Sequence, residues 1–408
     1  MKKKANKRIP CECLDFVEAS HRQQVYPLIY CHMKILGHLN NKKVKQAVSL
    51  SSKVIPEILY VYDFKRNVFV NKGYTADDVV KDVTEFPISF LRYDLSHFPQ
   101  LQILIRSKGK YDYLIVVMSH LLADGEGFLQ YLYLLAELYN GKQLDLKMKN
   151  QREISFLLEN ICILPETEQT KIHKDFSVPA LRAKERGNLL ICVTKEISKS
   201  EMERIHQKAA LVHVTLNDIF MTAYARVIAR IQNIDVVVLP CPADLRKFYP
   251  GSKYLTVANM TGIYRRITVE NPLKYEFTST LQQLHIEMLL QKSRRRCFIG
   301  IKKLNKIFHY IPYGILSYVI RAAYKTLPVS YTNFGIINHE KISFKECFVQ
   351  NCFMTGTYRI APDFQLSIST FRETCTLNCT LIGNKQDERN GQYILEQVKH
   401  EILAWINN

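Results

Sequence analysis

The sequence predicts an α/β protein made of two halves. The chain has 408 residues, more than one ordinary hydrophobic core holds, so we expect two subdomains. In each half, apolar runs of strand length alternate with segments whose apolar residues recur at helical spacing, the pattern of layered strands and helices. A polar stretch with Pro165 and Pro179 lies between the halves. We therefore place an N-terminal subdomain at 1–165, a connection at 166–187 and a C-terminal subdomain at 188–408.

The first half begins with a basic stretch, 1–13, that we expect to be loose. Apolar runs then predict strands at 25–36, 58–70 and 100–105, and helical spacing predicts a helix at 40–54.

The next stretch, 111–140, carries the most informative pattern of the chain. A β-branched strand is predicted at 111–118, and apolar residues at helical spacing continue from Phe128 onward. His120 stands where the strand ends, and Asp124 stands where the helix begins, which is where α/β proteins place chemistry. Taken alone, His120 could be a hydrogen-bonded core histidine and Asp124 only the N-cap of the helix.

The second half repeats the alternation. Strands are predicted at 188–196, 235–240, 366–370 and 376–382, and helices at 200–211, 216–231 and 393–405. Two of the helices begin with capping boxes, formed by Ser198 with Glu201 and by Thr215 with Asp218.

The composition is that of a globular protein with an excess of positive charge. Hydrophobic residues make up 47% of the chain and charged residues 23%, and 56 Lys and Arg against 38 Asp and Glu give a net charge of +18. Such an excess favours anionic partners, although a generally basic surface would also explain it. No helix-turn-helix, zinc-finger or RNP-like string stands out, so we expect no nucleic-acid partner.

The cysteines and the hydropathy of the chain indicate the cellular compartment of the protein. The eleven cysteines lack the paired CxxC spacing of a zinc site, so we expect no metal, and their odd number indicates reduced thiols. No apolar region comes after the basic N-terminus as in a signal peptide, and no run approaches the roughly 18 apolar residues of a membrane span. We expect a cytoplasmic protein, with peripheral membrane contact as an open alternative.

Five segments, in order, carry a resemblance to a known family. The string SHLLADG at 119–125 resembles the HHxxxDG signature of the CoA-dependent acyltransferase superfamily, which includes chloramphenicol acetyltransferase, alcohol acetyltransferases, polyketide-associated acyltransferases and peptide-synthetase condensation domains. PADLR at 242–246, ANMTG at 258–262, VSYTNFG at 329–335 and APDF at 361–364 are similar to later segments of that family. The resemblance implies two chloramphenicol-acetyltransferase-like subdomains, each a mixed sheet with helices, with the active site in a tunnel between them.

The sequence departs from the family pattern at two places. Ser119 stands where the first histidine of the signature is found, a position that many members lack. The aromatic DFGWG string of condensation domains is absent, and YTNFG stands near its place, which lowers the odds of a peptide-bond-forming domain.

The resemblance gives His120 and Asp124 different roles. A neutral imidazole, with an ordinary pKa of about 6.5, can take the proton of an attacking alcohol or amine, so His120 is cast as the general base. Asp124 is placed to brace the turn, and the resemblance implies Arg246 as its ion-pair partner, unless Arg246 is a solvated surface residue. Gly125 would leave room for the thioester. By alignment, Asn333 would donate to the oxyanion, unless it only forms a turn before Gly335.

A basic segment is the candidate for donor binding. No acidic residue occurs from Met288 through His339, and Arg294, Arg295 and Arg296 lie in this stretch. A basic amphipathic helix is predicted there, with Lys302, Lys303 and Lys306 on one face and Ile301, Leu304, Phe308 and Ile311 on another. This helix could bind CoA phosphates, an acidic carrier protein or a membrane surface. Alternatively, it could be an ordinary packed helix whose basic face is exposed to solvent.

These observations predict an enzyme that moves an acyl group from acyl-CoA to a hydroxyl or amine, with no tightly bound cofactor. Two alternatives stay open. The donor could be the thioester of an acyl carrier protein, as in condensation and release enzymes, or the chain could be a non-catalytic member that binds an acyl thioester or a partner protein. Because two halves in one chain can build an interfacial site internally, we expect a monomer.

Overall fold

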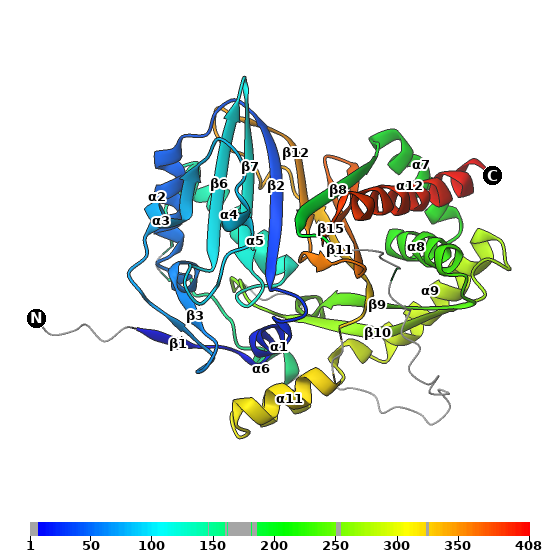
Figure 1. The fold of residues 1–408 in the computed structure, drawn as a ribbon, viewed down its shortest axis with the longest axis horizontal. Helices are drawn as coiled ribbons and strands as arrows, with labels where there is room; N and C mark the ends of the chain where they lie inside the picture. The colour runs from blue at the N-terminus through cyan, green and yellow to red at the C-terminus, as the bar shows by residue number, and fades with distance from the viewer. Residues whose placement is uncertain are drawn as a thin grey trace, which may run out of the picture.

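The computed structural model describes residues 7–145, 147–159, 161, 181, 186–249, 254–323 and 326–408. Figure 1 shows two sheets side by side, one in each half, each accompanied by helices. The mixed α/β architecture agrees with the predicted fold class. Apart from 181, 186 and 187, the predicted connection lies outside the described residues.

The N-terminal sheet has five strands in the order β12-β2-β7-β6-β5. They are β2 Leu28–Leu36, β5 Val80–Asp82, β6 Leu101–Lys108, β7 Tyr111–Ser119 and β12 Phe348–Thr355. The edge strand β12 comes from the C-terminal part of the chain and pairs antiparallel with β2, so it runs beside the N-terminal strands in Figure 1. One strand of this N-terminal sheet therefore comes from beyond the predicted connection at 166–187. The division into two subdomains stays a prediction.

The remaining elements of the first half lie around this sheet. They are β1 Arg8–Pro10, α1 Cys13–His21, α2 Asn41–Ser51, η1 Pro56–Leu59, β3 Val61–Asp63, β4 Val68–Val70, α3 Ala76–Val79, α4 Ile88–Leu91, α5 Gly125–Tyr139 and α6 Ser155–Leu158. Two expectations were wrong here. Part of the stretch expected to be loose forms β1, which pairs with β4, and the buried Cys11 and Cys13 anchor the start of α1 in the core. The single strand expected at 58–70 is a short helix and two short strands.

The C-terminal sheet has the strand order β11-β14-β15-β13, and β8 also pairs with β15. Its strands are β8 Leu189–Ile197, β11 Val329–Ile337, β13 Arg359–Ile360, β14 Phe364–Phe371 and β15 Thr374–Gly383. The helices of this half are α7 Lys199–Leu211, α8 Leu216–Gln232, α9 Phe277–Ser293, η3 Arg296–Phe298, α10 Ile301–Ile307, α11 Tyr313–Ala323 and α12 Lys385–Asn407. Both predicted capping boxes are present at the starts of α7 and α8, whereas α12 begins eight residues earlier than the predicted 393.

A long hairpin connects the two halves. Its strands, β9 Val236–Asp244 and β10 Thr261–Glu270, pair only with each other among the described strands, and the short helix η2 Leu245–Phe248 begins the loop between them. In Figure 1 the hairpin runs from the C-terminal half toward α1. Residues of this loop meet the start of α5, where they build the candidate active site.

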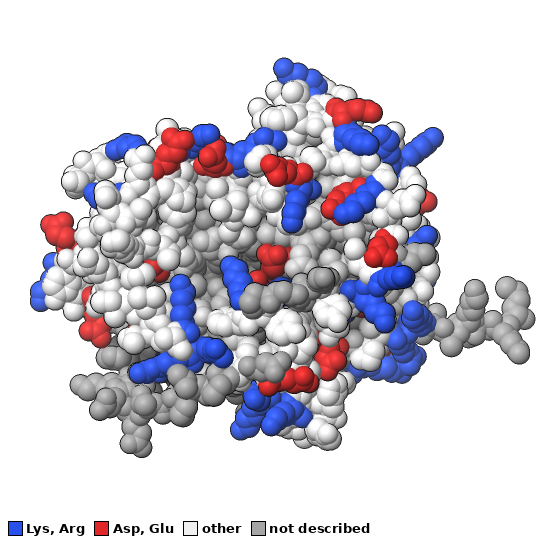
Figure 2. Space-filling view, turned by 180° about the vertical axis from the view of Figure 1, so that it is seen from behind, with Lys and Arg blue, Asp and Glu red and all other residues white. Residues whose placement is uncertain are grey.

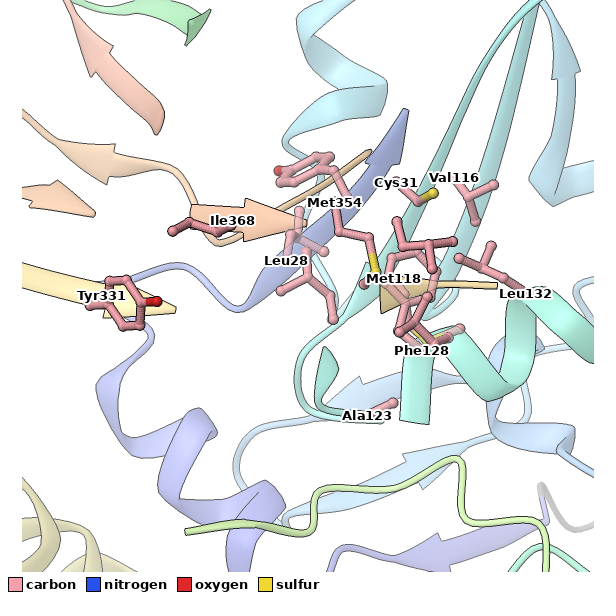
Figure 3. Close-up of a cluster of buried hydrophobic side chains, with 14 of the residues drawn as sticks. Leu28, Cys31, Val116, Met118, Ala123, Phe128, Leu132, Tyr331, Met354 and Ile368 are labelled. Carbon is pink, nitrogen blue, oxygen red and sulfur yellow. The ribbon is translucent and has the colours of Figure 1, made fainter. Parts of the chain in front are cut away.

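The core continues from one half into the other. Figure 3 shows Phe128 and Leu132 of α5 beside Met118 and Val116 of β7, with Met354 of the crossover strand next to them. The two sheets also meet through a buried hydrogen bond of 3.1 Å from the Met354 amide to Ser369 Oγ in β14. Burial of this apolar surface is the main favourable term that holds the halves together. Within the described part of the chain, no helix is both long and apolar enough to cross a membrane.

Candidate active site

His120 comes directly after the last residue of β7. The β2–β7 register puts Ser119 opposite Leu28, and the His120 amide donates to the Pro27 carbonyl at 2.9 Å, so the main chain stays fixed one residue beyond the strand. The Leu122 amide then bonds to the Ser119 carbonyl at 3.0 Å and closes the turn. The side chain of His120 is half-buried. The sheet therefore fixes the position of the imidazole and leaves part of it exposed to solvent.

Asn259, in the loop after η2, holds the imidazole. Its amide nitrogen donates to the His120 carbonyl at 2.8 Å and to Asp15 Oδ1 at 2.9 Å. The His120 carbonyl can only accept a hydrogen bond, so this end of the side chain must be the NH₂ group. The amide oxygen then faces His120 Nδ1 at 3.2 Å. Because a neutral imidazole carries one proton, that proton lies on Nδ1, and the lone pair is on Nε2, which no described residue engages.

Asp15 fixes Asn259 from the other side. It lies on α1, is fully buried and forms an ion pair of 2.5 Å with Arg152. Arg152 also donates to the Leu122 carbonyl at 3.1 Å, so the pair touches the turn that carries His120. Burial raises the pKa of Asp15, and the nearby charge of Arg152 opposes that rise.

Asp124 is the N-cap of α5 and receives four hydrogen bonds. Oδ1 accepts from the Gly127 amide at 2.8 Å, and Oδ2 accepts from Arg246 at 3.0 Å, from the Met260 amide at 2.7 Å and from the Thr261 hydroxyl at 2.8 Å. Burial by itself disfavours the ionised carboxyl, but Arg246 and these bonds outweigh it, so the pKa of Asp124 is lowered. Asp124 thus ties the start of α5 to the loop of the β9–β10 hairpin.

Arg246 uses all of its hydrogen-bonding capacity in this contact. Its guanidinium donates to Asp124 and Asp244, to the hydroxyl and carbonyl of Thr256 and to the carbonyl of Ala258, all at 2.8–3.0 Å. A guanidinium has five N–H donors in a fixed geometry, so each one has a partner here. The structure therefore brings together the two residues that the family resemblance paired, and the Arg246 side chain is only 11% exposed, so it is not a solvated surface residue.

Two glycines allow close contacts at the start of α5. A Cβ atom on Gly125 would come within 2.6 Å of the ring of Phe334 in β11, and one on Gly127 would come within 2.8 Å of the Ala258 carbonyl. Gly125 therefore lets Phe334 pack against the helix start. Its predicted role, leaving room for a thioester, stays a prediction.

Asn333 lies in β11 and makes a turn at the strand's irregular part. Its side-chain oxygen accepts from the Gly335 amide at 2.8 Å, which is the turn contact that the sequence left open. Its nitrogen lies 3.3 Å from Asn217 Oδ1 and 3.4 Å from the Tyr331 hydroxyl. These distances are long for hydrogen bonds, so the amide is weakly engaged. Donation to an oxyanion stays a prediction for Asn333.

The three arginines of the basic segment lie at the end of α9 and the start of η3, and all are half-buried. This turn packs on β10, since a Cβ atom on Gly262 would come within 2.3 Å of the Cys297 carbonyl. Gly262 is next to Thr261, the residue that bonds to Asp124. Arg296 has one buried nitrogen, Nη2, without a hydrogen-bond partner among the described residues. Their role toward the donor stays a prediction.

The sequence did not reveal Asp15, Arg152 or the contact of Asn259 with His120. Asn259 was found only as part of a segment similar to the family, with no role. Asp15 lies 244 residues from Asn259 and 137 from Arg152 along the chain, so no local pattern connects them. The available signal was a charged residue on the apolar side of a short helix, which in α1 is buried with Leu14 and Phe16.

Comparisons with solved structures identify the fold. Trichothecene 15-O-acetyltransferase from Fusarium sporotrichioides has a TM-score of 0.69 at 13% identity, over 98% of this chain and 95% of that one. Polyketide synthase associated protein 5 from Mycobacterium tuberculosis has a TM-score of 0.66 at 12% identity, over 98% of this chain and 99% of that one. The condensation domain of the Monacolin K polyketide synthase has a TM-score of 0.66 at 11% identity, over 98% of both chains.

No family model matches the sequence, and no curated protein matches it either. The structural likeness covers almost the whole chain, so both halves belong to the same fold. The chain has the fold shared by CoA-dependent acyltransferases and condensation domains, as the resemblance implied. At this identity the likeness establishes the fold alone.

Proposed function

Starting from this fold, we propose that the protein transfers an acyl group from a thioester to a hydroxyl or amine, with His120 as the general base. One observation carries the proposal. The amide oxygen of Asn259 faces His120 Nδ1 at 3.2 Å, which favours a proton on Nδ1, and Nε2 has no partner among the described residues. A half-buried imidazole with a free, oriented lone pair is what proton abstraction from an acceptor requires.

The transfer is a direct attack without an acyl-enzyme. The acceptor O–H or N–H gives its proton to His120 Nε2 as the oxygen or nitrogen attacks the thioester carbonyl. The C–S bond then breaks, and the leaving sulfur takes the proton back from Nε2. Throughout, Nδ1–H keeps its hydrogen bond to the Asn259 oxygen, and this bond also supports the transient imidazolium.

The second part of the proposal concerns the negative charge that forms on the thioester oxygen. A donor aimed at that oxygen lowers the barrier. The weakly engaged amide of Asn333 is the candidate from the sequence, and its long contacts to Asn217 and Tyr331 leave it able to change partners.

The donor is acyl-CoA or the thioester of an acyl carrier protein. The similar structures include an O-acetyltransferase and condensation domains, so the comparisons favour neither donor. The arginines at 294–296 suit the phosphates that either donor carries, and among the described residues Nη2 of Arg296 has no hydrogen-bond partner.

The test is acceptor-dependent release of thiol from acyl-CoA of increasing chain length, with a panel of alcohols and amines. We expect release by the wild-type protein and a loss of about 10²–10⁴-fold in His120→Ala, because removing a general base costs that much. His400→Ala is the matched control, since His400 is an exposed histidine on α12, and it should keep full activity.

Repeating the assay with acyl-carrier-protein thioesters separates the donors. Release from the carrier thioester alone would assign the carrier-dependent alternative. Release that persists unchanged in His120→Ala would contradict the mechanism. No release from either donor, together with binding of the acyl thioester, would identify a non-catalytic binder.

A further inference from the structure

Helix α11 has apolar residues on two opposite sides. On one side Leu316 and Ile320 are buried, and the Tyr313 ring lies 5.2 Å from that of Phe16 in α1. On the other side three large side chains are exposed, Ile315 by 59%, Tyr318 by 71% and Val319 by 47%. Their i, i+3, i+4 spacing puts them in one stripe along the helix. A helix that is apolar all round is normally buried, but no described residue covers this stripe.

Positive charge borders the stripe. The helix before it, α10, buries Ile301 and Leu304 and exposes three lysines, as the sequence predicted, namely Lys302, Lys303 and Lys306. Arg321 is exposed on α11 itself, and the sequence contains no acidic residue from Met288 through His339. Lys and Arg side chains also gather along the lower edge of the molecule in Figure 2. The stripe is therefore an apolar surface on a stretch of chain that carries cations and no acidic residue.

The stripe lies on a ridge. In Figure 1, α11 forms the lower edge of the molecule and projects below α1 and α6. Tyr310, in the turn before α11, is 86% exposed. Tyrosines with an apolar ring and a polar tip are typical of the boundary between lipid chains and water, and long lysine side chains can reach the headgroups from there.

We propose that α10 and α11 dock on the surface of a bilayer that contains anionic phospholipid. The exposed stripe enters the headgroup region, and the lysines of α10 and Arg321 contact the anionic headgroups. A bilayer fits a projecting apolar ridge, whereas the acidic helix of a carrier protein would need a complementary surface and would leave much of this ridge uncovered. This docking goes beyond the proposed acyl transfer and does not depend on it.

The docked face lies one helix away from the site. α11 packs on α1, and α1 carries Asp15, which holds Asn259 against His120. A docked protein therefore has its site close to the membrane, where an acceptor with a long apolar chain resides.

Sedimentation with vesicles tests the proposal. The full-length protein is mixed with vesicles of phosphatidylcholine alone or with about one-third phosphatidylglycerol, and binding should require the anionic lipid and weaken with added salt. Combined Ile315→Ser, Tyr318→Ser and Val319→Ser should weaken binding at least about tenfold, through lost apolar contact. Combined Lys302→Gln, Lys303→Gln and Lys306→Gln should weaken it by about 100-fold at low salt.

Two controls make the outcome clear. Leu211→Ser removes an apolar side chain that is 80% exposed at the end of α7, away from α11, and should bind like wild type. His120→Ala should also bind like wild type, so the docking survives even if the proposed activity is wrong. Vesicle binding that is absent, or unaffected by the stripe substitutions in folded protein, would overturn the proposal. Stripe-dependent binding to an acyl carrier protein without vesicle binding would overturn it in favour of a protein partner.

Discussion

Two buried aspartates flank His120, and each forms an ion pair with an arginine. Asp124 pairs with Arg246, and Asp15 pairs with Arg152. Asp124 bonds to the main chain of Gly127 and Met260, so it holds two segments of backbone together. Asp15 acts on a side chain instead, since it orients the Asn259 amide that faces the imidazole.

The two aspartates differ in what the buried charge does: one holds the backbone around the site, and the other orients a side chain in it. The charge of Asp124 is well compensated, and the pKa of this carboxyl is lowered despite full burial. Burial raises the pKa of Asp15, although Arg152, Asn259 and the Glu12 amide all donate to this carboxyl. We infer that Asp124 mainly stabilises the fold around the turn, while Asp15 and Asn259 mainly set which nitrogen of His120 carries the proton.

The largest expected effect is that of Asp124→Ala. It removes one of the two carboxylate partners of the buried Arg246 and leaves the Met260 amide unpaired, so the free energy of unfolding should fall by about 3–5 kcal/mol and activity should be lost with the fold. Denaturant unfolding followed by circular dichroism measures this. Asp77→Ala, which breaks an exposed ion pair of 2.8 Å with Lys45, should cost less than about 1 kcal/mol. A stable, folded Asp124→Ala protein would contradict the bracing role.

The next effect separates catalysis from stability. Asn259→Ala removes the contact that holds the His120 tautomer, so kcat should fall by at least about tenfold with little change in KM. The matched control is Asn150→Ala. Asn150 makes two hydrogen bonds to Val257 in the same loop, at 2.8 and 3.0 Å, without touching His120. Both variants should lose about 1–3 kcal/mol of stability, but only Asn259→Ala should lose activity. Equal losses of kcat in Asn259→Ala and Asn150→Ala would mean that activity depends on the integrity of the loop and not on the tautomer of His120.

The smallest effect is a pair of opposite pH dependences. The ordinary pKa of an aspartate is 3.8, and that of Asp124 is lower in the folded protein, so its stabilisation is present above about pH 4 and is lost as the pH falls below that value. The pKa of Asp15 is raised, so its ionisation costs stability as the pH rises above about 4. Relative to wild type, Asp124→Asn should therefore be least destabilised in acid, and Asp15→Asn should be most destabilised there. Unfolding measured across pH checks this, and slopes of the same sign would contradict the comparison.

Local patterns predicted much of the fold and half of this site. The strand–turn–helix string placed His120 and Asp124, and capping boxes placed the starts of α7 and α8, because these signals lie within a few residues of each other. Arg246 lies 122 residues from Asp124, and only the family resemblance paired them. Asp15 and the crossover strand β12 had no such pattern, because their partners are set by the packing of distant segments.

The most direct test of the account is the protonation of His120 itself. In protein with isotope-labelled histidine, a long-range proton–nitrogen correlation spectrum distinguishes Nδ1–H from Nε2–H, and His120→Ala assigns the signal. For the neutral imidazole we predict a proton on Nδ1 and a bare Nε2 in the wild-type protein, with that preference lost in Asn259→Ala. A proton on Nε2 in the wild type would contradict the account, because His120 could then not accept the proton of the acceptor.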